Sequence, residues 1–306
     1  MKRKVIQIAG STQLVSLPRK WAQAHNIQRG QEIDVMEDGN RVIISADNAT
    51  PIMKMEFNIS GCQTMVSRIV GALYRKGVDE LKVVYDDPEL LKEVDEALNK
   101  DTVGFEMLEQ GDNYCIIKYV AGGIEEFDSI LRRIFLLLNN MCDETAEAFR
   151  IGQYAKLSNL ALLEESNNRF TTICKRYLNK SRGSIRMEVG PLYHIVEELE
   201  KVADQYKYIC QHFATLGKNS SIKLDKSVLN TFFLANSMIR SYYELFYKFD
   251  KEKILAIKKT RSKVIEDAHA HFNKRLSHAD YWLTHHSVVL ANIIFELIGS
   301  CLVISL

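Results

Sequence analysis

The stretch MKRKVIQIAGSTQLVSLPRKWAQAHNIQRGQEIDVMEDGNRVIIS, residues 1–45, has the most specific residue order in the chain and decides how its N-terminal part folds. Apolar runs alternate with glycine-containing turns, which predicts two β-hairpins. The predicted strands cover roughly residues 5–8, 14–17, 33–35 and 42–44. Pro18 cannot donate to a strand ladder but suits the first turn of a helix, so we expect a short helix over Arg19 to His25. Elements this short bury little surface, and the unit therefore needs a partner copy.

Charge is distributed unevenly along this stretch. Residues 1–30 contain no Asp or Glu, whereas residues 31–50 contain five acidic residues against the single basic Arg41. The basic residues of the first thirty are Lys2, Arg3, Lys4, Arg19, Lys20 and Arg29. A concentrated basic patch attracts a phosphate backbone through counterion release, and a two-fold dimer doubles it. On charge alone, a solvated basic N-terminus remains the more common explanation.

The order of residues resembles the SpoVT/AbrB family of DNA-binding domains. The matching segments are Arg3-Lys4-Val5, Ala9-Gly10-Ser11, Leu17-Pro18-Arg19-Lys20-Trp21, Ile27-Gln28-Arg29-Gly30, Ile33-Asp34-Val35 and Asp38-Gly39. Ala9, Asn26 and Gln31 depart from the family's usual residues. The resemblance implies a homodimer of interleaved, swapped β-hairpins that binds DNA. It also implies phosphate or groove contacts by Lys2, Arg3, Lys4, Arg19 and Lys20, and base readout by Gln7 and Gln23.

The composition of the 306 residues fits a soluble protein of two or three domains with a formal net charge of +1. Its six cysteines form no C-x-x-C pair, which favours reduced thiols in a cytosol. No signal peptide is evident, because the basic start leads into alternating strands. Residues 288–306 are long enough to span a membrane, but Asn292, Glu296 and Ser300 interrupt them. We therefore expect a buried last helix, no membrane insertion and a cytoplasmic protein.

Residues 52–121 predict a second, smaller domain after a polar linker. The pattern reads β-α-β-α-β-β and favours a small α/β sandwich with its helices on one face. The segment shows no glycine-rich phosphate loop, catalytic triad or metal-ligand spacing. We interpret it as a connector or dimerisation module.

Residues 124–306 are dominated by 3.6-residue periodicity, and Pro191 is the only proline among them. Six long helices are predicted, at 124–150, 154–179, 191–215, 223–249, 251–276 and 280–305. Long helices with short loops pack antiparallel, which indicates two tandem three-helix bundles, at about 124–216 and 222–306. The whole chain is thus expected to be a multidomain α+β protein, with the first domain at 1–47.

One pair of carboxylates in the helical part has a chemically suggestive spacing. Glu200 and Asp204 lie four residues apart, on one helix face, where carboxylate oxygens suit a hard metal ion. Taken alone, such a pair is usually a solvated face. In context it resembles the PhoU family of phosphate-uptake regulators, whose fold is two three-helix bundles. The resemblance implies a metal ion (iron, zinc or magnesium) held by Glu200, Asp204 and Glu164. Departures are Gln205 for a histidine, Asn168 for a second carboxylate, and Ser300 for an aspartate.

Five of the eight histidines fall between 269 and 286, and we interpret them as solvated or packing residues, with zinc or pH sensing as the alternative. The combined resemblances favour a DNA-binding transcriptional regulator linked to phosphate homeostasis, in a chain type known among archaea. Expected partners are DNA, a second copy of the chain, and phosphate-transport or signalling proteins. The alternative is a PhoU-type protein–protein adaptor, with the N-terminal unit serving only to dimerise. An antitoxin fits the N-terminal unit but not the long helical part. An enzyme is disfavoured, because no nucleophile–base or cofactor motif is present.

Overall fold

In this computed structural model the described residues are 1–8, 10–46, 52–121, 127–180, 188–219 and 222–306, and they separate into units spanning 1–51 and 52–306. The N-terminal unit consists of β1 (Val5–Ile8), β2 (Thr12–Val15), α1 (Arg19–Ala24), β3 (Asp34–Asp38) and β4 (Arg41–Ser45). β1 pairs antiparallel with β2, and β3 with β4, as two separate hairpins. Asn26 adopts a left-handed conformation (φ 50°) just after α1, which ends the helix there.

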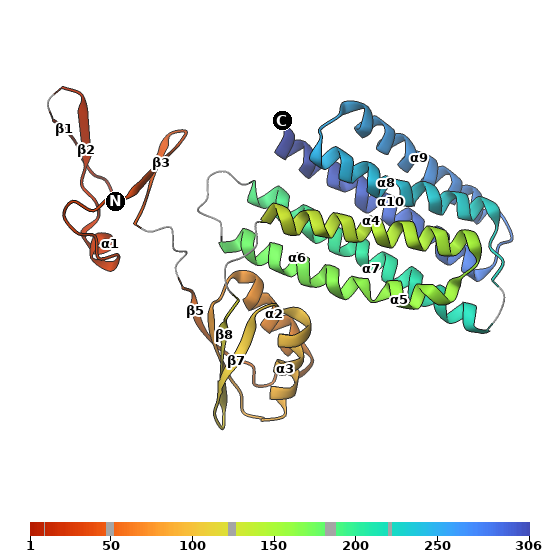
Figure 1. The fold of residues 1–306 in the computed structure, drawn as a ribbon, viewed down its shortest axis with the longest axis horizontal. Helices are drawn as coiled ribbons and strands as arrows, with labels where there is room; N and C mark the ends of the chain where they lie inside the picture. The colour runs from red at the N-terminus through yellow and green to blue at the C-terminus, as the bar shows by residue number, and fades with distance from the viewer. Residues whose placement is uncertain (9, 47–51, 122–126, 181–187, 220–221) are drawn as a thin grey trace. The chain divides into compact units, whose positions relative to one another are not determined.

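The second unit begins with the predicted α/β region. Its elements are β5 (Lys54–Asn58), a 3₁₀ turn (Gln63–Met65), α2 (Val66–Lys76), β6 (Glu80–Val84), α3 (Leu90–Asp101), β7 (Phe105–Gln110) and β8 (Tyr114–Tyr119). The strand order is β5-β6-β8-β7, with β5 parallel to β6 and the other pairs antiparallel. Helices α2 and α3 lie on one face of this sheet (Figure 1), and their apolar residues pack against it. The other face carries ion pairs such as Lys54–Glu80 and Lys82–Glu56, both at 3.1 Å. Helices therefore cover a single face of the sheet.

The helical region follows. Its elements are α4 (Phe127–Ile151), a 3₁₀ turn (Tyr154–Lys156), α5 (Leu157–Ala161), α6 (Leu163–Lys180), α7 (Val189–Asn219), α8 (Lys226–Tyr247), α9 (Lys251–Phe272) and α10 (His278–Ser305). The long helix predicted over 154–179 is thus broken into a 3₁₀ turn and two α-helices. The helix predicted to end at Thr215 continues through Gly217. A Cβ on Gly217 would lie 2.7 Å from Cβ of Tyr154, so this glycine permits close packing instead of ending the helix.

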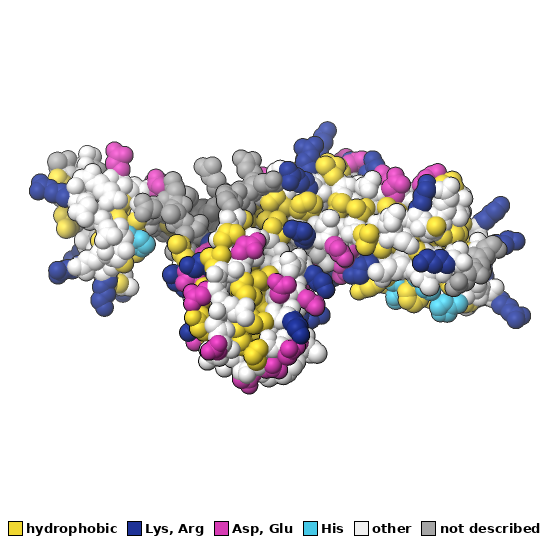
Figure 2. Space-filling model, turned by 60° about the horizontal axis from the view of Figure 1, so that its bottom comes forward, with side chains coloured by type: hydrophobic (Ala, Val, Ile, Leu, Met, Phe, Trp, Pro, Cys, Tyr) yellow, Lys and Arg dark blue, Asp and Glu magenta, His cyan; other side chains and the backbone are white. Residues whose placement is uncertain are grey.

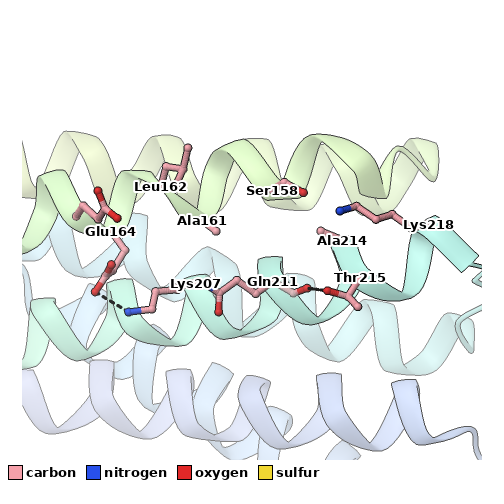
Figure 3. A pocket seen from close by; sticks show the side chains of 10 residues that line it. Ser158, Ala161, Leu162, Glu164, Lys207, Gln211, Ala214, Thr215 and Lys218 are labelled. Carbon is pink, nitrogen blue, oxygen red and sulfur yellow. Dashed lines mark hydrogen bonds and ion pairs between the residues drawn. The ribbon is translucent and has the colours of Figure 1, made fainter.

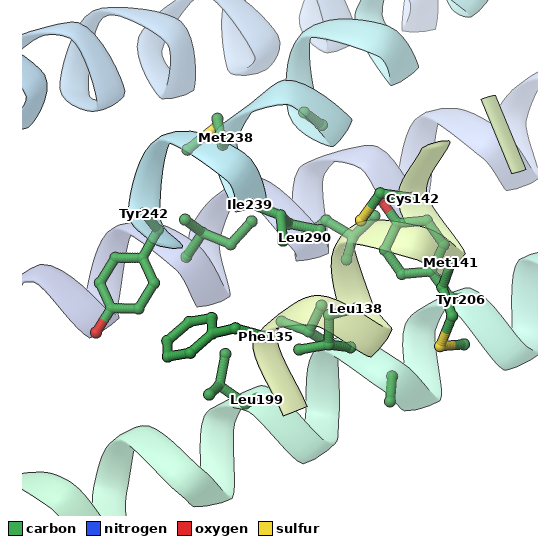
Figure 4. Packing of buried hydrophobic residues seen from close by; sticks show 14 of the residues in the cluster. Phe135, Leu138, Met141, Cys142, Leu199, Tyr206, Met238, Ile239, Tyr242 and Leu290 are labelled. Carbon is green, nitrogen blue, oxygen red and sulfur yellow. The ribbon is translucent and has the colours of Figure 1, made fainter. Parts of the chain in front are cut away.

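The two sets of three helices share one hydrophobic core. α4 packs on α8, and α7 packs along α10, so both sets contribute to the same apolar cluster. Figure 4 shows Phe135 and Leu138 of α4 with Leu199 of α7, Tyr242 of α8 and Leu290 of α10 in one group. The tandem bundles are therefore a single packed body in the described part of the chain.

α10 is the apolar helix expected at the C-terminus. Within the described residues, α10 is the one helix that is long enough and apolar enough to cross a membrane, by length and composition alone. It lies against α7, α8 and α9, and Leu290, Ile294 and Leu297 are buried in the shared core. That position fits a core helix.

A buried arginine joins the α/β region to the helices. Arg176 of α6 is 1% exposed, and its guanidinium donates to the carbonyl oxygens of Tyr74 (2.9 Å) and Val78 (2.7 Å) at the end of α2. The same guanidinium bonds Asp79 at 2.6 Å, and its carbon lies 4.2 Å from the ring centre of Tyr119. Charged hydrogen bonds of this kind fix geometry strongly. Residues 52–306 consequently form one compact unit.

Candidate nucleic-acid interface

The predicted DNA-contacting side chains are all exposed on the N-terminal unit. Lys2, Arg3 and Lys4 precede β1, Gln7 lies on β1, and Arg19, Lys20 and Gln23 lie on α1. None of the five basic side chains forms an ion pair with another described residue, so each is free to meet an anion. The short helix α1 starts at Arg19 because Pro18, extended at ψ 122°, occupies the position before it. The two basic residues thereby fall in the first helical turn.

Gln7 differs from the other predicted contacts. Its amide nitrogen donates to the carbonyl oxygen of Gly10 at 3.0 Å, across the β1–β2 turn. Gly10 has φ 77°, a conformation that favours glycine, and the bond from Gln7 holds this turn. Gln7 therefore supports the hairpin tip and reaches a base only if this bond is exchanged.

The N-terminal unit exposes most of its large apolar side chains. Val5, Ile6 and Val15 on the first hairpin are 54–60% exposed, and Val35 and Val42 on the second are 61% and 62% exposed. Helix α1 has no buried residue. At about 25 cal/mol per Å² of apolar surface, two such faces gain substantially by covering one another. A single copy of the N-terminal unit therefore leaves apolar surface exposed that pairing with a second copy would bury.

The predicted metal-binding carboxylates lie between α6 and α7, where lysines meet them. Lys207 approaches Glu164 at 2.9 Å and Asp204 at 3.6 Å, beside a cleft of about 260 Å³ (Figure 3). Burial raises the pKa of Asp204, and the Lys207 ammonium opposes that rise. Glu164 also accepts a hydrogen bond from Asn168 at 2.5 Å. The two predicted ligands Glu164 and Asp204 are thus bridged by a side-chain cation.

Glu200, the third predicted ligand, belongs to a separate ion pair. It is bonded by Thr171 and by the 2%-exposed Lys175 at 2.8 Å, and Lys175 also meets Glu197 at 2.6 Å. Among the described residues no group of three or more His, Cys, Asp or Glu side chains could hold a metal ion. These residues do not fit a divalent cation, because ammonium groups already occupy the space between the carboxylates.

Sequence reasoning missed Lys175 and Lys207. Lys207 lies three residues after Asp204, a spacing that places the two on one helix face and could have signalled the pair. Lys175 gave no such local signal, because Glu197 and Glu200 lie on another helix. Both lysines join α6 to α7.

The histidines of the C-terminal part lie mostly along α7 and α10. His286, 5% exposed, shares a hydrogen bond of 2.8 Å between its Nδ1 and Oε1 of Gln205. His212 of α7 stacks on Trp282 of α10, with ring centres 4.3 Å apart. His271, 1% exposed, pairs with Thr284 at 3.2 Å instead. Among these, His286 and His271 are packing residues, as the sequence pattern favoured.

Comparison with known protein families gives a match for the N-terminal unit. Residues 6–54 match the family model described as antidote-toxin recognition MazE, bacterial antitoxin. Neither the curated proteins nor the solved structures yielded a match to this chain. The N-terminal part is accordingly a regulator domain of the DNA-binding or antitoxin type.

Proposed function

We propose that the chain is a cytoplasmic transcriptional regulator whose N-terminal unit dimerises and binds DNA. One observation carries the proposal: a family-matched β unit presents exposed basic side chains that form no ion pair with another described residue, together with exposed apolar side chains. Pairing two copies covers the apolar faces and brings two basic sets together on one duplex. Phosphate contacts then supply affinity, and base contacts supply the choice of site.

The helical body is the sensory or partner-docking part of this proposal, with no enzymatic role. Its PhoU resemblance links the regulator to phosphate uptake. Support comes from the arrangement of two three-helix sets. The helical body differs from what the PhoU resemblance implies in one respect: Lys175 and Lys207 meet the carboxylates where a metal ion was expected. Phosphate-transport or signalling proteins are the partners that the proposal names.

The DNA-binding proposal is tested by reversing charge on α1. We expect R19E/K20E to lose at least tenfold in affinity for promoter fragments of phosphate-transport genes, because two cations per protomer become repulsive. Mobility shifts over a series of salt concentrations measure this. The matched control is K258E/K259E, which reverses two exposed lysines on α9 that form no ion pair within the described part of the chain. Equal binding by R19E/K20E and wild type would refute DNA contact through this unit.

An adaptor without DNA binding is the alternative. It predicts that wild type fails to shift any of these fragments even at low salt, while still dimerising through residues 1–51. R19E/K20E then retains its protein partner unchanged.

The family match gives an antitoxin role specific support as well. That reading predicts a toxic partner neutralised by this chain. Deleting the gene would then be lethal unless the partner's gene is deleted too, whereas a regulator deletion changes only transcription.

A further inference from the structure

Six exposed cations gather at one end of the helical body. They are Lys156, Lys218, Lys223, Lys226, Lys274 and Arg275, and we call this group the basic end. They come from the α4–α5, α7–α8 and α9–α10 connections and the helix ends beside them. Dark blue side chains project from this end of the body at the right of Figure 2.

Contacts between the connections show that they lie together. The amide of Asp225 donates to the Asp280 carboxylate at 2.9 Å, and the Lys274 ammonium donates to the Ser227 hydroxyl at 3.0 Å. Gly217 packs against Tyr154, as described above, which brings the end of α7 to the start of α5. Segments separated by more than 100 residues therefore form one surface.

Two carboxylates lie near the basic end, and Asp225 offsets part of the charge of Lys274. Asp225 and Asp280 are committed to capping α8 and α10, where they accept hydrogen bonds from Ser227 and Ser277. Within the described residues, none of the six cations forms an ion pair with a carboxylate. Six cations beside two carboxylates leave a net positive surface, which favours a polyanion over a neutral partner.

We propose that the basic end is a second nucleic-acid surface, which contacts the phosphate backbone of the DNA bound by the N-terminal unit. This inference rests on the proposed DNA-binding function. A chain that already holds duplex DNA keeps that polymer at high effective concentration, so even modest phosphate contacts elsewhere on the chain form readily. The contacts are electrostatic and carry no sequence information.

The experiment compares two fourfold charge reversals in the full chain. The first is K218E/K223E/K226E/K274E at the basic end. The matched control is K248E/K251E/K258E/K259E, which changes the same charge at exposed positions in and just before α9. We expect the first variant to make the slope of log affinity against log salt shallower by about 2–4, and the control to leave it within about 1 of wild type. Circular dichroism and thermal unfolding confirm that both variants fold.

Three outcomes overturn the inference. The slope stays unchanged in the basic-end variant, or it changes equally in the control, or the variant loses only binding to phosphatidylserine-containing vesicles. The R19E/K20E background separates this inference from the proposed function. Residual low-salt DNA binding there that disappears on basic-end reversal supports the second surface. If R19E/K20E alone removes all binding, the salt slope of the basic-end variant, measured with an intact N-terminal unit, decides the inference.

Discussion

Arg176 contributes a buried guanidinium to the contact between the α/β region and the helices. Replacing it with methionine leaves the Tyr74 and Val78 carbonyls without this donor, while Asp79 keeps Lys180 at 2.6 Å. Because one partner of a buried charged network is lost, we expect Arg176→Met to lower the free energy of unfolding by about 3 kcal/mol. Urea unfolding at neutral pH measures this. Arg169→Met, on the exposed face of the same helix, is the control. A loss under about 0.5 kcal/mol would contradict the role given to Arg176.

For single residues, the sequence predicted which helix face a side chain lies on, but not which side chains of other helices it contacts. The spacing of Glu200 and Asp204 placed both carboxylates on one side of α7, where they are found near α6. It could not reveal that Lys175 and Lys207 neutralise them, because the register of α6 against α7 is set by packing. Arg176 gave no signal either, since its acceptors lie 97–102 residues earlier.

The contact between α7 and α10 contains a buried histidine, His286, which predicts that folding stability depends on pH. Burial first, then the neighbouring His285 and His212, lowers the pKa of His286 to about 4. Its Nε2 is buried without a partner among the described residues. The unfolded chain therefore protonates His286 more readily than the folded chain does. The stabilisation linked to neutral His286 is fully present above the unfolded-state pKa of about 6.5.

We expect the folded state to lose stability as pH falls from about 6.5 to about 4, by up to about 3 kcal/mol from His286. Burial also lowers the pKa of His212, which adds loss in the same direction. Urea unfolding at pH 7.5, 5.5 and 4.5 measures the loss. His286→Gln, which cannot titrate, should show a smaller decrease. An equal decrease in both proteins would assign the acid sensitivity to other groups.

The order of helices followed from periodicity, and their ends did not. The predicted break between the last two helices is confirmed, because Ser277 and Asp280 form a capping box that starts α10. The glycine at 217, in contrast, predicts a stop but serves close packing against Tyr154. A local signal decided the first boundary, and a tertiary contact overrode the second.

At the scale of the whole molecule, the two units should unfold separately. Residues 1–51 leave apolar side chains exposed, so their stability depends on a second copy and on protein concentration. The two tryptophans, Trp21 and Trp282, fall one in each unit and report on them separately. In Trp282→Phe, we expect the Trp21 signal to unfold at lower urea on dilution. The Trp282 signal in Trp21→Phe should not move. A Trp21 transition independent of concentration would argue against dimerisation through this unit.

The hydrogen bonds of Arg176 to Tyr74, Val78 and Asp79 also have a consequence for synthesis of the chain on the ribosome. All four strands of the 52–119 sheet are made before α6, and the acceptors of the guanidinium at Tyr74, Val78 and Asp79 precede it by 97–102 residues. At roughly 5–20 residues per second, the emerging sheet waits about 5–20 s for its arginine. During that interval the carbonyls at the end of α2 lack this donor, so we expect the α/β region to be less stable before α6 is made.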